Sequence, residues 1–324
     1  MRAPQAAPFS STDTEHLGRV LREAVEASRA LVEGAPAAYI PELAQVDVEQ
    51  TSAAVTLVDG TLLAAGDALH HRFTLQSSAK LVLLAGLLEE IGEQRVFSLV
   101  GAEPSGASFA SIARLETDAR PANPLVNAGA IALCSLIPGG LVDKLGWLEG
   151  WTERLYGERL PVNTRVLASE RTTGDRNRAI AWYLKGAGIL AGPVDEILEA
   201  YFTLCSFEAG VAQVSRLGAV LAGGGAVPGA PGGVPPLLSR RTVGCVISLM
   251  ATCGMYDESG AHLLATGLPA KSGVSGVIAA VAPGRAGIAV ASPRVNAKGG
   301  SVRGHHVLGA LARDSGWQSW FLGG

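Results

Sequence analysis

The sequence predicts an α+β fold, in which an antiparallel sheet is flanked by helices and an all-helical part is inserted between its strands. Three observations predict it: strand patterns occupy residues 52–75, helical patterns fill most of 145–200, and strand patterns return over 268–291. A sheet whose strands come from both ends of the chain is completed around the helices between them. With 48% hydrophobic and 17% charged residues, the 324-residue chain can bury a large core.

The N-terminal half begins with helix and strand signals. Charged and apolar residues recur at helical spacing over residues 14–33, which predicts an amphipathic helix. The β-favouring run 54–58 ends at the turn Asp59-Gly60, and a second turn at Gly66-Asp67 completes an antiparallel meander. The meander leads directly into a helix that contains Ser77.

Helix signals dominate the middle of the chain. Gly92 is expected to end the helix that contains Ser77, and another helix starts within residues 121–131. Gly192-Pro193 is expected to open a helix over residues 194–206.

The C-terminal third returns to the sheet after a long connection. The glycine- and proline-rich segment 223–236 is predicted to be flexible. Ser239 is expected to cap a helix that reaches Thr252, and a final helix is expected over about 301–313.

These elements predict one domain, residues 1–324, built from two parts. The sheet part is expected to contain about 36–110 and 262–324, and the helical part about 111–261.

Charge and hydropathy argue against two classes of partner. The formal net charge of −3 gives no reason to expect nucleic acid or acidic lipid. Residues 1–9 lack the continuous apolar core of a signal peptide, and no uncharged apolar run reaches the roughly 20 residues of a membrane span. We therefore expect a cytoplasmic protein with neither nucleic-acid nor membrane partners.

No metal site is expected. The cysteines show neither Cys-x-x-Cys pairing nor zinc-ligand spacing and are expected to be buried free thiols: Cys134, Cys205, Cys245 and Cys253. The six histidines, including the pairs His70-His71 and His305-His306, also lack metal spacing and are expected on the surface or in turns.

Ser77 precedes Lys80 by three residues, and the apolar run 81–88 follows. On a helix the two side chains lie one turn apart on the same face. A serine hydroxyl needs a base beside it to act as a nucleophile, and a lysine can be that base when burial lowers its pKa. The helix start would also favour developing negative charge. The alternative is a chance match in which Lys80 extends its ammonium to water.

Lys271-Ser272-Gly273 is a second motif, and it lies in a predicted strand. Ser-x-x-Lys on a helix followed by Lys-Ser/Thr-Gly on a strand resembles the β-lactamase/transpeptidase-like fold. In that arrangement the backbone N–H groups of Ser77 and Val274 would point at one carbonyl oxygen. Each donor of such an oxyanion hole contributes on the order of 3 kcal/mol. Together the two motifs predict an acyl-transfer enzyme.

The residues alone leave the roles of four polar side chains open. Tyr39 either projects into a cleft or packs on the surface, since the following Ile40-Pro41 favours an extended or turn conformation. Asn127 either caps a helix or faces a substrate. Glu170 and Asn177 are expected in a polar loop and a helix start.

No Ser-x-Asn lies between the two motifs, which departs from β-lactamases and penicillin-binding proteins. Instead, the chain resembles the serine-dependent glutaminase family from about residue 36 to 310. The matching segments are 39–44, 73–80, 103–106, 123–124 with 127–131, Glu170 with 176–177, Tyr201 with 205–206, 253–257 and 267–276.

The resemblance implies hydrolysis of L-glutamine to L-glutamate and ammonia through a glutamyl-serine ester, with neither metal nor organic cofactor. Carried over by position, it implies Ser77 as nucleophile, Lys80 as base and Tyr256 as the proton relay to the leaving ammonia. The substrate-binding positions it implies are Asn127, Glu170, Asn177 and Tyr201, with the Val274 amide as oxyanion contact and Tyr39 at the pocket entrance. Glu170 suits the substrate ammonium, and the amides and phenol suit its oxygens. The family also implies a homodimer or homotetramer.

The chain departs from the family pattern at a few positions. Ala79 replaces a serine, and Ala110 and Gly300 replace asparagines, while the segment 223–236 is longer than usual. None is an implied contact with the substrate, so these departures bear on local hydrogen bonding.

Two other functions compete with this interpretation. One is a β-lactam- or peptide-acting serine enzyme of the same fold, which the missing Ser-x-Asn and missing secretion signal disfavour. The other is a non-catalytic amino-acid-binding module, which the intact Ser77, Lys80 and Tyr256 disfavour.

Overall fold

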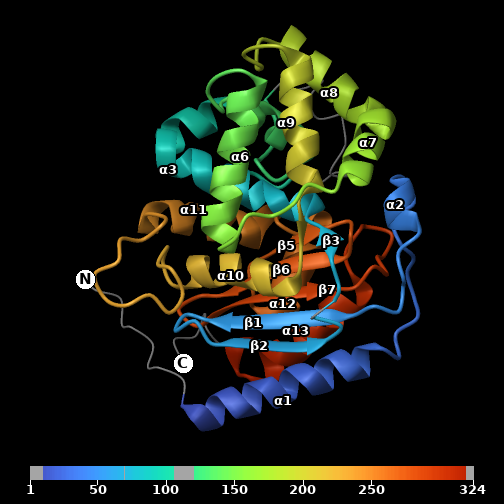
Figure 1. The fold of residues 1–324 in the computed structure, drawn as a ribbon, viewed down its shortest axis with the longest axis vertical. Coiled ribbons are helices and arrows are strands. Elements are labelled where there is room, and N and C mark those ends of the chain that lie inside the picture. Colours follow the sequence, from blue (N-terminus) through green and yellow to red (C-terminus); the bar gives the residue numbers. More distant parts are fainter. Residues whose placement is uncertain (1–9, 69, 106–119, 319–324) are drawn as a thin grey trace.

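The computed structural model describes residues 10–68, 70–105 and 120–318, so Ala110 lies outside the described residues. It contains a five-stranded antiparallel sheet in the order β2-β1-β7-β6-β5 (Figure 1). The strands are β1 (Ser52–Leu57), β2 (Leu62–Gly66), β5 (Ala270–Gly273), β6 (Val277–Ala282) and β7 (Ala286–Ala291). Strands from the two ends of the chain pair directly, with Val55 of β1 opposite Ile288 of β7. The predicted α+β architecture is confirmed.

Helices cover both faces of the sheet (Figure 1). On one face lie α1 (Ser11–Ser28) and α13 (Val302–Asp314), and α12 (Ser259–Thr266) packs against α13. On the other face α10 (Val211–Ala222) packs against β1, β6 and β7. A helical block lies beyond α10, and it consists of α3 (Lys80–Leu99), α5 (Asn127–Cys134), α6 (Leu141–Tyr156), α7 (Thr164–Thr173), α8 (Asp175–Gly186) and α9 (Val194–Ser206). The remaining elements are α2 (Pro41–Ala44), β3 (Phe73–Thr74), η1 (Gln76–Ala79), β4 (Glu208–Ala209), α11 (Arg240–Cys253) and η2 (Tyr256–Glu258).

Side chains along each strand point alternately to the two faces of the sheet, and they divide the core into two clusters. Val55 and Leu57 of β1 join the apolar cluster beneath α1 and α13, whereas Ala54 faces the helical block. Small residues bring α10 close to the sheet, because a Cβ on Gly287 would lie 2.0 Å from the backbone nitrogen of Ala219. This close packing joins the helical block to the sheet.

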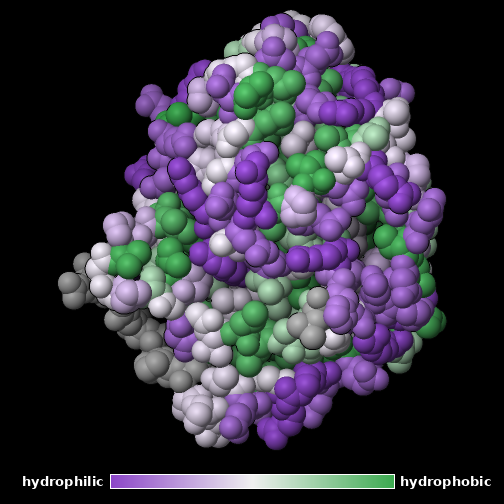
Figure 2. Space-filling view, in the orientation of Figure 1, coloured by the Kyte–Doolittle hydropathy of each residue, from purple (hydrophilic) through white to green (hydrophobic). Residues whose placement is uncertain are grey.

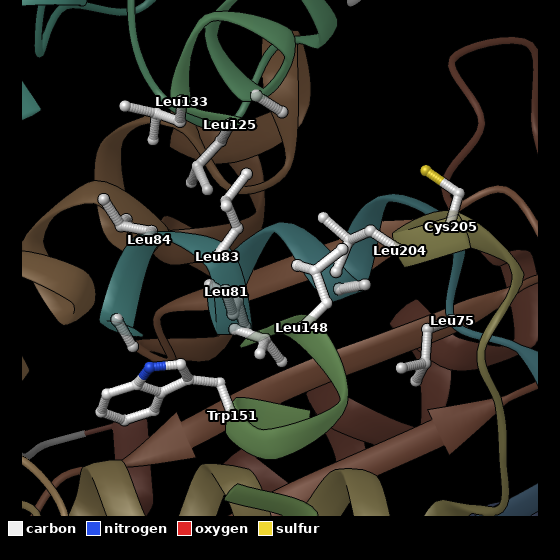
Figure 3. Packing of buried hydrophobic residues seen from close by; sticks show 14 of the residues in the cluster. Leu75, Leu81, Leu83, Leu84, Leu125, Leu133, Leu148, Trp151, Leu204 and Cys205 are labelled. Carbon is white, nitrogen blue, oxygen red and sulfur yellow. The ribbon is translucent and has the colours of Figure 1, made fainter. Parts of the chain in front are cut away.

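The larger of the two clusters surrounds α3. Figure 3 shows leucines of α3 packed among side chains from the neighbouring segments: Leu125, Leu133, Leu148, Trp151 and Leu204. Every residue from Lys80 to Leu88 is buried. The first turn of α3 therefore lies in an apolar environment, and Lys80 lies there with it.

Several predicted boundaries need correction. Gly92 adopts a left-handed φ of 76°, as a helix stop would, but α3 resumes and continues to Leu99. Val96 and Leu99 are buried against the core, so tertiary packing outweighs the local stop signal. The predicted helix over 14–33 ends at Ser28, and α12 was not predicted at all. The predictions for α9 and for α11, which Ser239 caps, are confirmed.

The division into a sheet part and a helical part stays a prediction. α10 falls in the sequence range of the helical part yet packs directly on the sheet. The glycine-rich segment after α10 folds back onto the sheet end, where the Gly229 N–H donates to the Val58 carbonyl at 3.1 Å.

Within the described ranges, no helix has the length and apolar character that crossing a membrane requires. On the face seen in Figure 2, hydrophilic residues predominate and apolar residues form small separate groups.

A buried arginine fastens the segment that links α1 to β1. Arg303 of α13 is fully buried and donates to the backbone carbonyls of Arg29, Leu31 and Glu49 at 3.0–3.2 Å. It also contacts the Glu49 carboxylate at 2.8 Å, and together with Arg294 it lowers the pKa of Glu49 to about 2. This one side chain therefore fixes the path of residues 29–51.

We predict that Arg303→Met destabilises the fold, because several partly buried carbonyl groups and the Glu49 carboxylate lose their donor. The free energy of unfolding should fall by at least about 3 kcal/mol, measured by urea denaturation. Arg241→Met removes an arginine that is 82% exposed and paired with Glu93, and it should shift the midpoint far less. Equal shifts in the two variants would show that the buried arginine is not a structural anchor.

Candidate active site

Ser77 and Lys80 lie side by side at the junction of η1 and α3. Lys80 Nζ is 3.0 Å from Ser77 Oγ and 2.7 Å from Asn127 Oδ1. Only 1% of Lys80 is exposed, so its side chain does not extend to water. The structure thus brings together the hydroxyl and the amine that the sequence motif pairs, although Ser77 lies on a 3-10 turn rather than on the α-helix.

The turn that carries Ser77 is fixed on both sides. Gln76 has a φ of 48°, which is uncommon for a residue other than glycine. The Leu75 N–H donates to the Phe207 carbonyl at 2.8 Å, and the Ser78 hydroxyl donates to the Leu75 carbonyl at 2.6 Å. These bonds hold the backbone in a strained conformation that directs the Ser77 side chain toward Lys80.

Burial sets the protonation of Lys80. Because the ammonium is removed from water, the pKa of Lys80 is lowered to about 8, even though the nearby Cys205 and Glu170 oppose the shift. At neutral pH a measurable fraction of Lys80 is therefore an uncharged amine, which can accept a proton.

A second buried lysine lies close to Tyr256. Lys271 Nζ lies 4.1 Å from the centre of the Tyr256 ring and donates to the Ser272 carbonyl at 2.7 Å. Burial, together with the charge of Lys80, lowers the pKa of Lys271 well below its ordinary value. Burial raises the pKa of Tyr256, while a side-chain hydrogen bond with Ser77 opposes that shift. Tyr256 therefore remains a neutral phenol beside the Ser77 hydroxyl.

Strand β5 lies directly against the Ser77 turn. A Cβ on Gly273 would lie 2.7 Å from the Leu75 carbonyl oxygen and 3.4 Å from the Ser78 nitrogen, so the lack of a side chain permits this approach. The next residue, Val274, is buried and packs with Ile40, Leu43 and Val166. The Lys-Ser-Gly motif thus reaches the Ser-x-x-Lys motif across the interior of the fold.

A cavity of about 300 Å³ opens beside Ser77. Its lining includes six of the predicted site residues: Tyr39, Ser77, Asn127, Glu170, Asn177 and Tyr201. Lys80, Tyr256 and Val274 are not part of the lining, and the first two contact Ser77 directly. Five lining residues were not predicted, namely Gln76, Thr173, Gly174, Arg176 and Cys205. Three of these belong to the segments that match the family, and their nearness in sequence to Ser77, Asn177 and Tyr201 is the signal that was available.

Asn127 is not a helix cap. Val126 occupies the N-cap position of α5, and Asn127 is the first helical residue. Its side-chain oxygen accepts from Lys80, and its amide nitrogen donates to Asn177 Oδ1 at 3.0 Å. Asn127 therefore connects the Lys80 amine with the polar wall of the cavity.

Glu170 supplies a carboxyl group to the same cavity. It lies in α7 rather than in a loop, and it is buried. Burial raises the pKa of Glu170 to about 7, against a hydrogen bond with Gln76 and the charge of Lys80. Tyr201 is buried on α9, whereas Tyr39 is 50% exposed. The cavity thus combines a carboxyl group deep inside with phenol and amide groups along its wall.

No group of three or more histidine, cysteine, aspartate or glutamate side chains that could hold a metal ion exists within residues 10–68, 70–105 and 120–318. All four cysteines are unpaired, and three are buried, while Cys245 is half-buried.

Comparison with known proteins places the chain among glutaminases. The family model described as Glutaminase matches residues 34–320. A protein named Glutaminase from Legionella pneumophila (strain Corby) is 49% identical over 300 residues, which cover 92% of this chain and 96% of the relative. Glutaminase 2 of Clostridium perfringens is 40% identical over 299 residues, which cover 91% of this chain and 97% of that relative.

Solved structures agree. The probable glutaminase ybaS superimposes with a TM-score of 0.90 at 36% identity, covering 95% of this chain and 98% of the other. A probable glutaminase from Bacillus subtilis complexed with 6-diazo-5-oxo-L-norleucine gives a TM-score of 0.83 at 31% identity. The match covers 97% of this chain and 98% of the other. The family match extends over most of the sheet, the helical block and the cavity, and the chain therefore belongs to the glutaminase family.

Proposed function

We propose that this chain hydrolyses L-glutamine to L-glutamate and ammonia through a glutamyl ester on Ser77. The observation that carries the proposal is the buried Lys80 amine, 3.0 Å from the Ser77 hydroxyl at the edge of a polar cavity. Membership of the glutaminase family supports the choice of substrate.

Acylation begins with proton transfer. Asn127 accepts an N–H of Lys80, which leaves the lone pair of the neutral amine free to take the Ser77 proton. Ser77 Oγ then attacks the side-chain amide carbon of glutamine. The backbone N–H groups of Ser77 and Val274 stabilise the oxyanion in this proposal, and the close approach of β5 to the Ser77 turn supports their convergence.

Breakdown of the tetrahedral intermediate requires a proton on the leaving nitrogen. Tyr256, hydrogen-bonded to Ser77, passes the proton held by Lys80 to the departing ammonia. Water then attacks the ester, Lys80 accepts a proton from that water, and the proton returns to Ser77 Oγ as glutamate leaves. Each cycle consumes one glutamine and one water and restores both side chains.

The polar wall selects a free amino acid. A substrate ammonium beside Glu170 favours the ionised carboxylate, since it supplies the charge partner that burial otherwise withholds. In this proposal Asn127, Asn177 and Tyr201, which line the cavity, donate hydrogen bonds to the substrate's oxygens. The homodimer or homotetramer and the cytoplasmic location stay predictions from the sequence.

We predict that Ser77→Ala abolishes ammonia release, because no nucleophile remains, while L-glutamine binding stays measurable by calorimetry. Ser98→Ala removes an exposed hydroxyl from α3, the helix that follows the Ser77 turn, and should turn over glutamine like the wild type. Normal turnover by Ser77→Ala would remove Ser77 from the mechanism. Hydrolysis of a chromogenic cephalosporin by a wild type that releases no ammonia would favour the β-lactam-acting alternative.

The pH dependence follows from two groups. Lys80 must be uncharged and Glu170 ionised in the free enzyme, and their pKa values are about 8 and about 7. We expect kcat/KM to level off above about pH 8, to fall about ten-fold per unit toward pH 7, and to fall more steeply below that. A profile that is flat between pH 6 and 9 would exclude Lys80 as the base.

Glu170→Gln should affect both binding and the titration of Lys80. Loss of the ammonium partner should raise the KM for L-glutamine at least about ten-fold. Because the Glu170 charge raises the pKa of Lys80, its removal should shift the Lys80 limb of the profile to lower pH. Glu93→Gln alters a surface ion pair with Arg241 and should change neither the KM for L-glutamine nor the Lys80 limb of the pH profile. An unchanged KM in Glu170→Gln would mean that another group binds the ammonium.

A further inference from the structure

A cluster of titratable side chains lies outside the cavity, next to the turn that carries Tyr256. It consists of Glu258 at the end of η2, His262 on α12 and His305 on α13. His262 is buried, and the side chains of Glu258 and His305 are 18% and 26% exposed. The expectation that the histidines lie on the surface or in turns is therefore wrong for His262, and it is also wrong for the buried His71. The proposed mechanism uses none of these groups.

Hydrogen-bond directions fix the proton positions in the cluster. The Thr266 hydroxyl donates to the His262 carbonyl at 2.8 Å, so it accepts from the His262 ring, whose Nε2 lies 3.3 Å away. Burial and the charge of His305 lower the pKa of His262 to about 4, so its ring is neutral and its Nδ1 is an acceptor. The facing Nδ1 of His305, 3.3 Å away, is then the donor.

The second nitrogen of His305 points toward a carboxylate. Its Nε2 lies 3.9 Å from Glu258 Oε2. His305 therefore lies between the two other groups, with Nε2 facing the Glu258 carboxylate and Nδ1 facing the His262 ring, and it links Glu258 to His262.

The residues around Glu258 and His305 leave room for this pair and add contacts to it. A Cβ on Gly300 would lie 2.6 Å from both Glu258 Oε2 and His305 Nε2, so a side chain there would displace them. Asn296 donates to Glu258 Oε1 at 2.8 Å, and Lys298 pairs with Asp257 at 3.3 Å. Burial alone would raise the pKa of Glu258, but the nearby His305 and the hydrogen bond from Asn296 outweigh it and lower that pKa.

Glu258 is two residues from Tyr256, in a turn that needs external support. Tyr256 has a φ of 56°, an unfavourable conformation for a side chain of that size. The Ser259 hydroxyl braces the turn by donating to the Tyr256 carbonyl at 2.8 Å and accepting from the Met255 N–H at 3.0 Å. The Glu258 side chain adds a connection from the same turn to α12 and α13.

We propose that Glu258, His305 and His262 form a positioning network that holds the Tyr256 phenol against Ser77. The inference rests on the proposed function, in which Tyr256 passes a proton to the leaving ammonia. Loosening the network should impair this proton delivery while leaving the Ser77–Lys80 pair and the cavity intact.

Two substrates separate proton delivery from the rest of the reaction. Ammonia must be protonated as it leaves, whereas the γ-thiomethyl ester of L-glutamate releases methanethiolate, which departs without a proton. Both substrates form the same glutamyl ester on Ser77 and consume one water on its hydrolysis. Ammonia release and thiol release are measured in parallel, with Tyr256→Phe as the reference for lost proton delivery.

His305→Asn is compared with His306→Asn, which changes the exposed neighbour on the same helix. We expect His305→Asn to lower kcat for glutamine about 10- to 100-fold, as a displaced catalytic group does, with KM and thioester turnover within about two-fold of wild type. His306→Asn should match the wild type on both substrates. Gly300→Ala, which keeps every side chain of the network but separates Glu258 from His305, should show the same selective loss.

Equal losses on both substrates, or loss of the folded state in both His305→Asn and Gly300→Ala, would overturn the network as a positioning device. Wild-type behaviour of His305→Asn would also overturn it. Normal glutamine turnover by Tyr256→Phe would instead overturn the role of Tyr256 in the proposed function, so the two failures are distinguishable.

Discussion

The site depends on keeping an amine inside an apolar core. Lys80 begins a helix whose following residues are buried among leucines (Figure 3). Burial lowers the pKa of Lys80 to about 8. An isolated charge there would be costly, so the neutral form becomes accessible and can act as a base. Asn127 satisfies one N–H of the amine and leaves its lone pair directed at Ser77. The same apolar cluster that stabilises the fold thus lowers the pKa of the proposed base.

The fold brings this amine next to β5, which carries the proposed oxyanion contact, by joining distant parts of the chain. α3 follows the N-terminal strands, and β5 comes from the C-terminal part, yet Gly273 packs against the turn that precedes α3. The short pair β3–β4 fixes the other side of that turn through Phe207, which lies between α9 and α10 in sequence. Three segments that are far apart in sequence, around residues 75, 207 and 273, therefore determine the position of one hydroxyl.

Local patterns predicted the parts of the site that are local in the chain. Ser77 and Lys80 are three residues apart, so a helical turn was enough to pair them, and the apolar run after Lys80 indicated its burial. Gly92 misled, because its usual local role as a helix stop is overridden by tertiary packing. For Asn127 the local pattern left a cap and a substrate contact open, and its contact with Lys80 could not be predicted from neighbouring residues. The His262–His305 pair, 43 residues apart, gave no local signal. Long-range pairs of this kind depend on how helices pack, which periodicity does not specify.

Backbone strain is concentrated where the reacting groups meet. Among the residues that the structure describes, Gln76 and Tyr256 are the two non-glycine residues with positive φ. Such conformations cost on the order of 1–3 kcal/mol each and persist only where the surroundings impose them. Gln76 directly precedes Ser77, the proposed nucleophile, and Tyr256 brings its phenol to the same hydroxyl. Contacts with neighbouring segments hold each strained turn. The segment at the start of β4 and the strand β5 hold the turn of Gln76. Ser259 and the Glu258–His305 pair hold the turn of Tyr256. The stability of the sheet and helices is thus what keeps two unfavourable turns facing each other across the reaction centre.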